Sequence, residues 1–457
     1  MYDKFIRPLL IQPATGLISN PNYLMLLAFF NGALLMNFHS IYRKDLSFII
    51  VLLFFGIISM INIRYWWASV ANGVFTMVHF GGKFPRMANH SNLEFFIEII
   101  ILVLLLAKIA NRRFSIPPNM AATLFRFSLI TVYFYTGFHK LNTDFFNSNV
   151  SCVNDINTYA LSILTSKPIA LSSGISGFFQ YATIFTEIIV PFGLLWTKTR
   201  KYSAIILLSF HIYLGLTVFG DFSALACFLI LGCLVDFEAA KFDFRLLKYI
   251  RTYLFLIIAT NLLKPFLDKY IVAQHVPHIH GAIFNIGAIL FFIFYLKNYQ
   301  PTGSKLSRKE YILPACCCLL ISVWSMKTYI GLGNSANLTM FSNLVTEKSR
   351  SNHLLIDTRK TKIFDFEEDN LLILKLDQRL QKEKVEGFML PVTEFRHRAA
   401  NWVKSHPKWK ISCTLVYKGD TTRFADLSKT DFIRTKWWYR YLNFRKIQPN
   451  GSCKCLW

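Results

Sequence analysis

The chain has 457 residues, of which 53% are hydrophobic and 16% aromatic, with a mean hydropathy of +0.37 and a formal net charge of +24. Soluble globular domains are rarely this apolar, so the composition excludes an ordinary soluble enzyme. A nucleic-acid partner would require a basic soluble module. Only the C-terminal tail could supply one, and its composition argues against that role, so we expect no nucleic-acid partner.

Apolar residues are gathered in runs of about 16 to 22 residues, close to the roughly 20 that a helix needs to cross a bilayer. Ten runs follow one another along the chain, at about 22–40, 47–66, 93–110, 120–138, 178–196, 202–220, 222–236, 248–267, 280–297 and 312–332. The run at 222–236 is short enough to be re-entrant, so we expect nine or ten transmembrane helices, with no cleaved signal peptide ahead of them. Open sheets leave backbone groups unsatisfied in lipid, so the expected fold class is an all-α polytopic membrane protein with a small α+β C-terminal domain.

The basic residues between these runs predict the orientation. The odd-numbered connections hold the larger basic groups: Arg43 and Lys44; Lys108, Arg112 and Arg113; Lys198, Arg200 and Lys201; Lys241, Arg245 and Lys248; and Lys305, Arg308 and Lys309. Basic loops stay in the cytoplasm, so the even connections and everything after about residue 333 are expected outside.

One predicted span carries unusual polar residues. The stretch RFSLITVYFYTGFHKLN, residues 126–142, places Arg126, Tyr133 and Lys140 seven residues apart, along one helix face. Gly137 on the same helix would let a neighbour or a ligand approach closely. A charge inside a span is costly and usually faces a partner or a cavity. Snorkelling at a helix end would explain Lys140 alone, whereas the whole stripe predicts a lined cavity.

Other spans offer groups that could meet this stripe. Glu187 lies in the run FTEIIVPFGLLWTKTR and is a plausible counter-charge for Arg126. His211 lies in the middle of LLSFHIYLGLTVFGDFS, and Asn89 and His90 stand at the outer start of another span. A single buried histidine is more often structural than catalytic, but several polar groups near the outer halves of helices favour a site.

The tail is expected to form a separate domain outside the membrane. We divide the chain into a helical transmembrane domain at 1–333 and a small extracytoplasmic domain at 334–457. NHLLIDTRK, NLLILKL and WKISCTLVYKG have the pattern of strands, and VTEFRHRAANWVKS that of an amphipathic helix.

Cysteines on the outer side are candidates for disulfides. Cys152, Cys413, Cys453 and Cys455 are predicted there, and we expect Cys453 or Cys455 to pair with Cys413 or Cys152. The consecutive residues 316–318, all cysteine, are expected to be small buried residues of a span, and no metal site is predicted.

The pattern R-x6-Y-F-x2-G-x2-K-L, from Arg126 to Leu141, resembles the vitamin K-dependent γ-carboxylases and their bacterial relatives, the HTTM membrane proteins. Further motifs of that family stand in the same order, and the resemblance covers about 85–236: Asn89-His90-Ser91 before an apolar helix, then Glu187, Arg200 and His211, then FGDFS at 219–223.

The resemblance implies an enzyme that uses a reduced quinone. In that family the lysine matching Lys140 deprotonates reduced vitamin K or menaquinol. The quinol then reacts with O2 to give an epoxide and a strong base, which removes a γ-proton from a glutamate so that the carbanion captures CO2. By resemblance Lys140 and His90 would be catalytic, and Asn89, Tyr133 and His211 would lie at the quinol.

The same resemblance implies structural roles for some residues and a location for the protein. Arg126 and Glu187 would form a structural ion pair between helices, and a structural or supporting role is favoured for His211. The protein would be integral to a bacterial inner membrane, in contact with lipid and quinol and with a peptide or protein substrate. In activity it would be a quinol-dependent carboxylase-like lyase with an epoxidase half-reaction.

Two departures leave alternatives open. The family carboxylases often carry a second lysine just before the base, where this chain has His139, and their large outer region is here about 120 residues. The segment 339–356 is polar and motif-like without an assignable role. The alternatives are a non-carboxylating HTTM protein that assists maturation or export of a peptide or toxin, and a transporter, although no internal repeat favours transport.

Overall fold

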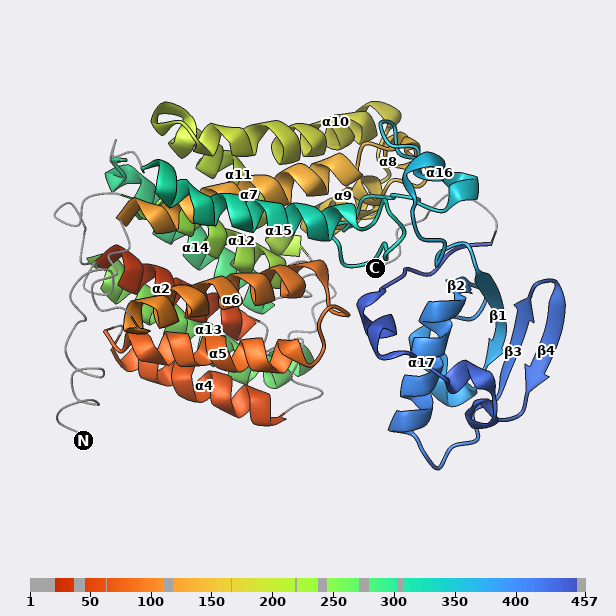
Figure 1. Cartoon of the computed structure of the whole chain (residues 1–457). Coiled ribbons are helices and arrows are strands. Elements are labelled where there is room, and N and C mark those ends of the chain that lie inside the picture. Colours follow the sequence, from red (N-terminus) through yellow and green to blue (C-terminus); the bar gives the residue numbers. More distant parts are fainter. Residues whose placement is uncertain are drawn as a thin grey trace.

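The fold is that of a computed structural model of the whole chain. The structure describes residues 21–36, 46–62, 64–110, 118–165, 167–217, 220–236, 245–270, 279–301 and 307–449. Within them the protein is mostly helical, with one small antiparallel sheet near the C-terminus. The helices lie side by side in one body, and the tail lies at one end of it (Figure 1).

The long helices follow the apolar runs. In chain order they are α2 (Pro21–Met36), α4 (Leu46–Ile61), α5 (Trp66–Gly81), α6 (Asn89–Ala110), α7 (Pro118–His139), α9 (Cys152–Thr165), α10 (Ser173–Ile184), α11 (Thr197–Thr217), α12 (Gly220–Cys233), α13 (Arg245–Tyr270), α14 (Ile279–Asn298) and α15 (Ile312–Met326). A π-helical turn, η3 (Phe185–Ile189), and a 3-10 turn, η4 (Val190–Leu194), continue α10, and a short α8 (Thr143–Phe146) follows α7. Every expected run therefore contains a helix, and two helices, α5 and α9, were not expected.

Helix α5 changes the numbering of the connections. It runs antiparallel to α4, since Ser59 faces Ser69 at one end and the Phe48 ring stacks on His79 at the other, 4.0 Å between centroids. The C-terminal end of α5 meets the tail, because Arg440 donates to the carbonyl of Gly82. The start of α4 therefore lies at the tail end of the helical body, so counting connections as odd or even fails before α6.

From α6 onward the two ends of the helical body are consistent with that count. Helices α7, α11, α13 and α15 begin, and α12 and α14 end, at the end away from the tail, where Arg200, Asp236 and Tyr299 meet. Lys198, Lys201, Arg245 and Arg308 lie in or beside these helix ends. The expectations for Arg43, Lys44, Arg112, Arg113, Lys241 and Lys305 fall outside the described residues.

The tail carries a four-stranded sheet of order β2-β1-β3-β4, with β1 (Asn370–Leu376), β2 (Met389–Pro391), β3 (Cys413–Tyr417) and β4 (Asp420–Phe424), all antiparallel. Helix α17 (Val392–Ser405) packs on it through Phe395, Ala399 and Trp402. The predictions for NLLILKL, WKISCTLVYKG and VTEFRHRAANWVKS are confirmed. The prediction of a strand at NHLLIDTRK is wrong: Asn352 and His353 bind the end of α7 instead, and residues 358–361 form the short helix α16 (Thr358–Thr361).

The hydrophobic core forms two clusters. One joins the long helices from Met25 to Ile321 and takes in Leu338, and the other joins the sheet to α17 from Leu371 to Leu427. The chain between them, 333–353, is held at both ends by isolated bridges: Asn142–His353 joins it to the helical body just after α7, and Gly333–Asn443 joins it to the last part of the tail. Tail and helices are therefore connected by an extended joint and not by a loose linker.

Among the described residues, one continuous helical stretch, Ser173–Leu194, has both the length and the apolar composition to cross a bilayer. Five apolar helices are shorter: Leu24–Met36, Ser47–Ile61, Phe222–Cys233, Ile283–Asn298 and Ile312–Met326.

Cys152 is disulfide-bonded, and its partner lies outside the described residues. Cys413 is a buried free thiol, so the predicted alternative that involves Cys413 is wrong. The segment 450–457, which contains Cys453 and Cys455, is not described.

Candidate functional site

The polar stripe of α7 opens into a cavity at the tail end of the helical body. Tyr133, Thr136 and Lys140 line this cavity because residues three, four and seven apart share a helix face. Gly137 lets the π-helical turn approach α7: a Cβ there would stand 2.5 Å from Ile188 Cγ1 and 3.1 Å from Glu187 Cβ. The expected close approach at Gly137 is therefore made by a neighbouring helix. It brings Glu187 against α7 about one helical turn before Lys140.

Lys140 and Glu187 form a buried ion pair in the cavity wall. Lys140 Nζ lies 2.8 Å from Glu187 Oε2 and 3.1 Å from Oε1, and it also donates to the Thr136 carbonyl at 3.2 Å. Their side chains are 4% and 9% exposed. An ammonium group has three donors, and all three are used here. The arrangement therefore shows a lysine held by a carboxylate instead of a free amine.

The local backbone explains why Glu187 reaches the cavity. Pro191 has no N–H, so the normal helical bond to the carbonyl of residue 187 cannot form. The chain widens into a π turn, in which the Val190 N–H donates to the Phe185 carbonyl, and then tightens into a 3-10 turn. Such π turns are rare and frequently occur at functional sites.

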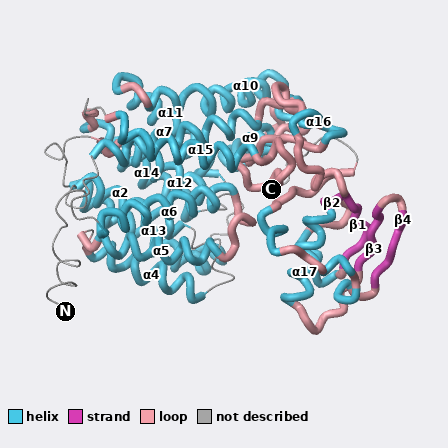
Figure 2. The backbone as a smooth tube through the Cα atoms, viewed as in Figure 1, coloured by secondary structure: helices cyan, strands magenta, loops and turns pink. Residues whose placement is uncertain are grey.

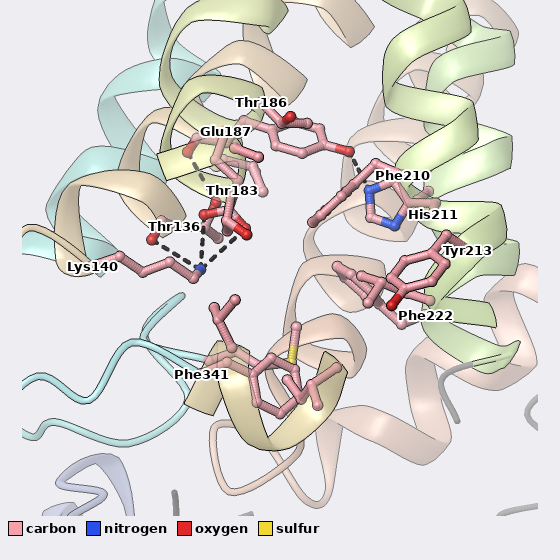
Figure 3. A pocket seen from close by; sticks show the side chains of 18 of the residues that line it. Thr136, Lys140, Thr183, Thr186, Glu187, Phe210, His211, Tyr213, Phe222 and Phe341 are labelled. Carbon is pink, nitrogen blue, oxygen red and sulfur yellow. Dashed lines mark hydrogen bonds and ion pairs between the residues drawn. The ribbon is translucent and has the colours of Figure 1, made fainter. Parts of the chain in front are cut away.

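The cavity has a volume of about 300 Å³ and is mostly apolar. Its walls come from α6, α7, α9, α10 with the turn η3, α11 and α12, and from the start of the tail. Among the lining residues are Leu93, Leu129, Val153, Ile156, Phe178, Phe179, Ala182, Phe210, Leu214, Phe222, Leu225, Leu229, Met340 and Phe341. Lys140 and Glu187 face His211, Tyr213 and Phe222 across the space (Figure 3). One charged pair in an apolar chamber favours a mainly apolar ligand with a polar end.

A second polar group lies opposite the ion pair. The Tyr133 hydroxyl and His211 Nε2 are hydrogen-bonded, whereas His211 Nδ1 is buried without a hydrogen-bond partner. Ser223 donates to the backbone carbonyl of His211 at 2.6 Å and fixes the helix there. The structure thus places both Tyr133 and His211 at the cavity, as a hydrogen-bonded pair.

His90 and Asn89 do not line the cavity. The His90 ring is 6.3 Å from the ring of Phe222, and the Phe222 ring is 4.9 Å from that of His211, so Phe222 stands between the two histidines. Asn89 accepts a hydrogen bond from the Leu338 backbone N–H at 2.7 Å. The structure gives Asn89 a role in holding the start of the tail and places His90 behind Phe222, a residue of the cavity wall.

The expected ion pair between Arg126 and Glu187 is not formed. Arg126 Nη2 lies 2.5 Å from Asp236 Oδ2, and Arg126 Nε donates to the Cys233 carbonyl at 2.8 Å. Fourteen residues separate Arg126 from Lys140, about 21 Å along a helix, and Glu187 lies at the level of Lys140. Arg126 therefore belongs to a different polar cluster at the other end of α7.

That second cluster also includes Arg200. Its Nη1 lies 2.8 Å from the same Asp236 oxygen, and the Tyr299 hydroxyl donates to Oδ1 at 3.0 Å. All three ionised side chains are buried. Asp236 thus holds α7 and α11 together through two guanidinium groups. Sequence reasoning overlooked it because it is the last residue of the predicted short span 222–236, where an acid is unremarkable.

The cavity is closed on one side by the first segment of the tail. Met340 and Phe341 line it, in a segment where four residues other than glycine have positive φ: Ala336 (63°), Leu338 (62°), Phe341 (54°) and Asn343 (54°). Such backbone is unfavourable and persists only where the surroundings enforce it. Here Asn343 is held between the Val150 carbonyl, at 2.7 Å, and the Cys152 N–H, at 2.9 Å. The segment 339–356, which had no role by sequence, therefore supplies this cover.

A buried charged cluster in the tail fixes the same segment. Thr346 donates to both oxygens of Glu367, at 2.8 and 3.0 Å, and Lys362 Nζ lies 2.7 Å from Glu367 Oε2 and 2.6 Å from the Thr346 carbonyl. Burial, with help from the nearby Glu347 charge, raises the pKa of Glu367 to about 7, although Lys362 opposes the rise. The cover of the cavity is therefore tied to a group that titrates near neutral pH.

Among the described residues, no group of three or more His, Cys, Asp or Glu side chains could hold a metal ion. Comparison with protein-family models, with curated proteins and with solved structures finds no match.

Proposed function

We propose that the helical body is an integral membrane domain and that its long helices cross the bilayer. The support is a belt of exposed apolar side chains over several helices: Ile50, Phe54, Ile57 and Ile61 on α4; Phe178, Tyr181 and Phe185 on α10 and η3; Phe255, Leu256, Leu262 and Leu263 on α13; Ile286, Leu290, Ile293 and Phe294 on α14; and Leu319, Leu320 and Val323 on α15. Soluble monomers rarely expose contiguous apolar surface of this extent. Lipid is the solvent that such a surface fits.

The proposed orientation places the tail outside the cytoplasm. Lys198, Lys201, Arg245 and Arg308 lie in or beside the helix ends away from the tail, and basic residues favour the cytoplasmic side. The disulfide at Cys152, near the tail end, agrees with an oxidising compartment there. A bacterial inner membrane has these two sides.

We propose that the cavity binds a reduced quinone, such as menaquinol, and that the protein is a quinol-dependent enzyme of the γ-carboxylase type. The observation that carries this proposal is the Lys140–Glu187 ion pair at one end of an apolar cavity of about 300 Å³. The apolar walls suit a fused ring and an isoprenoid chain. The ion pair and the hydrogen-bonded Tyr133 and His211 provide polar groups at two separate points of the wall.

The ion pair would accept the hydroxyl proton in two moves. Lys140 Nζ first passes a proton across 2.8 Å to Glu187 Oε2, which leaves a neutral amine beside a neutral acid. The amine then takes the proton of the bound hydroxyl and becomes an ammonium again. Both residues are therefore proposed as catalytic, and the role of Glu187 differs from the structural one that the sequence implied.

The other residues would bind and exclude water. His211 and Tyr133 would orient the far side of the ring, and Met340 and Phe341 would keep water from the reacting side. When bound, the quinol would supply the electrons and the strong base that, with O2 and CO2, convert a peptide glutamate to its γ-carboxylated form.

The test is oxygen-dependent conversion of menaquinol to its epoxide by the purified protein in nanodiscs. Lys140→Arg keeps the positive charge but cannot pass on a proton, because guanidinium stays protonated, and we expect turnover to fall by at least about 10²-fold. The turnover of Glu187→Gln should fall by a similar factor, because this change removes the acceptor of the Lys140 proton. Quinol should still bind to this variant. Lys198→Arg, an exposed exchange of the same kind, is the matched control and should be fully active.

A wild-type protein that binds and consumes no quinol would refute the quinol chemistry. Full activity of Lys140→Arg would refute the proton transfer through this pair. Mass spectrometry of a co-expressed peptide for one added carboxyl group decides whether the chemistry extends to carboxylation.

A further inference from the structure

The tail contains a cleft that the proposed chemistry does not use. It has a volume of about 740 Å³ and lies between α17 and the chain that follows β4. Phe424 and Phe432 form an aromatic wall, with ring centroids 5.7 Å apart. Four cations line the same cleft: Arg396, Lys410, Arg423 and Lys429.

The two acidic residues of the cleft offset its four cations only in part, although hydrogen bonds to Ser428 and the charges of Lys429 and Lys410 lower the pKa of Asp426. Asp431 is paired with Arg434, outside the cleft, at 3.1 Å. Asp426 accepts the backbone N–H of Ser428 at 3.0 Å, as the cap of a short helix. Within the described part of the chain, no ion pair occupies the four lining cations, so the cleft has an excess of positive charge.

Arg396 distinguishes the cleft from an exposed basic patch, because part of its guanidinium group is buried. Its Nε is buried and has no hydrogen-bond partner, whereas the neighbouring Arg398 on α17 is paired with Glu394 at 2.6 Å. A buried donor without a partner costs free energy, and a bound acceptor would recover it. Because Arg396 also lines the cleft, its guanidinium group is available to an anionic ligand there.

Strand β4 leads into the cleft and is an edge strand. Its partner β3 lies on one side, and no strand of the described chain pairs with the other side (Figure 2). A two-residue turn joins β3 to β4, with Tyr417 opposite Asp420, so the N–H and C=O groups of Thr421 and Arg423 point away from β3. An extended peptide can add to such an edge.

We propose that the cleft and the β4 edge bind an extended acidic peptide. Its backbone pairs with Thr421 and Arg423, and its carboxylates meet Arg423, Arg396 and the lysines beyond. Alternate side chains of a strand share a face, so acidic residues two apart reach the cations together. The proposal deepens the proposed function, on which it rests for one point: that this peptide carries the glutamate to be modified.

The binding test uses the whole chain in nanodiscs and a fluorescein-labelled peptide of alternating Glu and Thr. Fluorescence anisotropy should show saturable binding that weakens as salt is raised, because exposed charges are screened. The same peptide with Gln in place of Glu should bind at least about tenfold more weakly, since each carboxylate contact is charge-assisted.

Three variants locate the site. Arg396→Gln should weaken binding by about 10- to 100-fold, because its contact is buried. Thr421→Pro removes one outward N–H without removing a bond to β3, and should weaken binding with an unchanged melting temperature. Lys375→Gln, an exposed cation on β1, is the matched control and should bind like the wild type. If Arg396→Gln fails to fold, the binding of the Glu peptide to Thr421→Pro and of the Gln peptide to the wild type still tests the proposed site.

Equal binding of the Glu and Gln peptides overturns the proposal, and so does an equal loss in Lys375→Gln. Displacement of the peptide by inorganic sulfate at equal concentration also overturns it, because the cleft is then a site for small anions. Quinol consumption is measured on the same samples. Peptide binding without quinol consumption would support the peptide site and refute the proposed function. Quinol consumption without peptide binding would support the proposed function and refute the peptide site.

Discussion

Arg86 and Glu394, separated by 308 positions in the sequence, form a bidentate ion pair in which Nη1–Oε1 and Nη2–Oε2 are both 2.8 Å. The same guanidinium group donates to the carbonyls of Tyr439, Arg440 and Leu442. Burial acts to raise the pKa of Glu394, but Arg86 and Arg398 outweigh it and hold that pKa below its ordinary value. One residue just before α6 thus fixes the tail domain against the helical body.

Arg86→Ala should loosen the tail while leaving both hydrophobic cores intact. It leaves the buried Glu394 without its main partner, and removing one member of a buried pair typically costs about 3–5 kcal/mol. We expect rapid proteolysis in the joint at 333–353 and a lower melting temperature. Arg379→Ala, at an exposed pair with Asp377, is the control. Equal protease resistance of the two variants would contradict the anchoring role.

The Lys140–Glu187 pair should show strong energetic coupling. Glu187→Gln strands a buried ammonium group, which typically costs about 3–5 kcal/mol. The double variant Lys140→Met/Glu187→Leu should recover most of the stability and no activity, because an apolar replacement of a buried pair is often tolerated. Thermal unfolding in detergent measures the cycle. Additive effects of the two single changes would show that the pair contributes no coupling.

Arg126 should couple to Asp236 and not to Glu187. Asp236→Asn leaves two buried guanidinium groups without a counter-charge, so we expect a sharp fall in the yield of folded protein. In double-mutant cycles the coupling between positions 126 and 236 should be about 0.5–3 kcal/mol, and that between 126 and 187 close to zero. The reverse result would restore the pairing expected from sequence.

The stability of the tail should depend on the ionisation of Glu367. Its pKa is raised from 4.5 to about 7 on folding, so between those values the folded state holds the proton more tightly than the unfolded state. Stability therefore falls as pH rises through this window, by up to about 1.4 kcal/mol per unit. The pKa of His397 is lowered by burial to about 4, which works in the opposite direction. The measurement is consequently the difference in melting temperature between wild type and Glu367→Gln from pH 5 to 7.5, which should shift in favour of the variant as pH rises.

The disulfide at Cys152 should join it to the C-terminal peptide, because every other described cysteine is a free thiol and only Cys453 and Cys455 remain. A bridge that closes so long a loop typically contributes about 2–4 kcal/mol. Non-reducing peptide maps should contain a peptide with Cys152 linked to the GSCKCLW end. Identical maps with and without reductant would exclude the bridge.

Much of the helical fold follows from apolar periodicity, and the errors have physical causes. Helix α5 was missed and left in a predicted connection because Ser69, Asn72, Gly73, Thr76 and His79 interrupt its apolar residues directly after the run at 47–66. Helix α9 was missed because Asn154, Asp155 and Asn157 interrupt its apolar residues. Local pattern decides whether a segment is apolar, but where one helix ends and the next begins depends on packing.

Part of the cavity lining was predicted from the sequence, but its pairings and the positions of Asn89, His90 and Arg126 were not. The stripe from Tyr133 to Lys140 and the close approach at Gly137 follow from helical spacing, and Glu187 stood out as an acid within a span. Which acid meets which cation depends on how far each helix is shifted along its neighbour. That shift cannot be read from the local pattern of one sequence. Only the folded chain shows that Glu187 lies at the level of Lys140 and that Asp236 takes Arg126.

The cover formed by Met340 and Phe341 has a consequence for biosynthesis. A ribosome delivers these two residues after every other residue that lines the cavity, and helices made earlier can already pack together while the tail is still being translated. A half-made copy would therefore have its lysine and carboxylate in place but an open chamber. The chamber can be completed only after residue 341 has been made, so shorter copies lack the two side chains that close it beside Lys140.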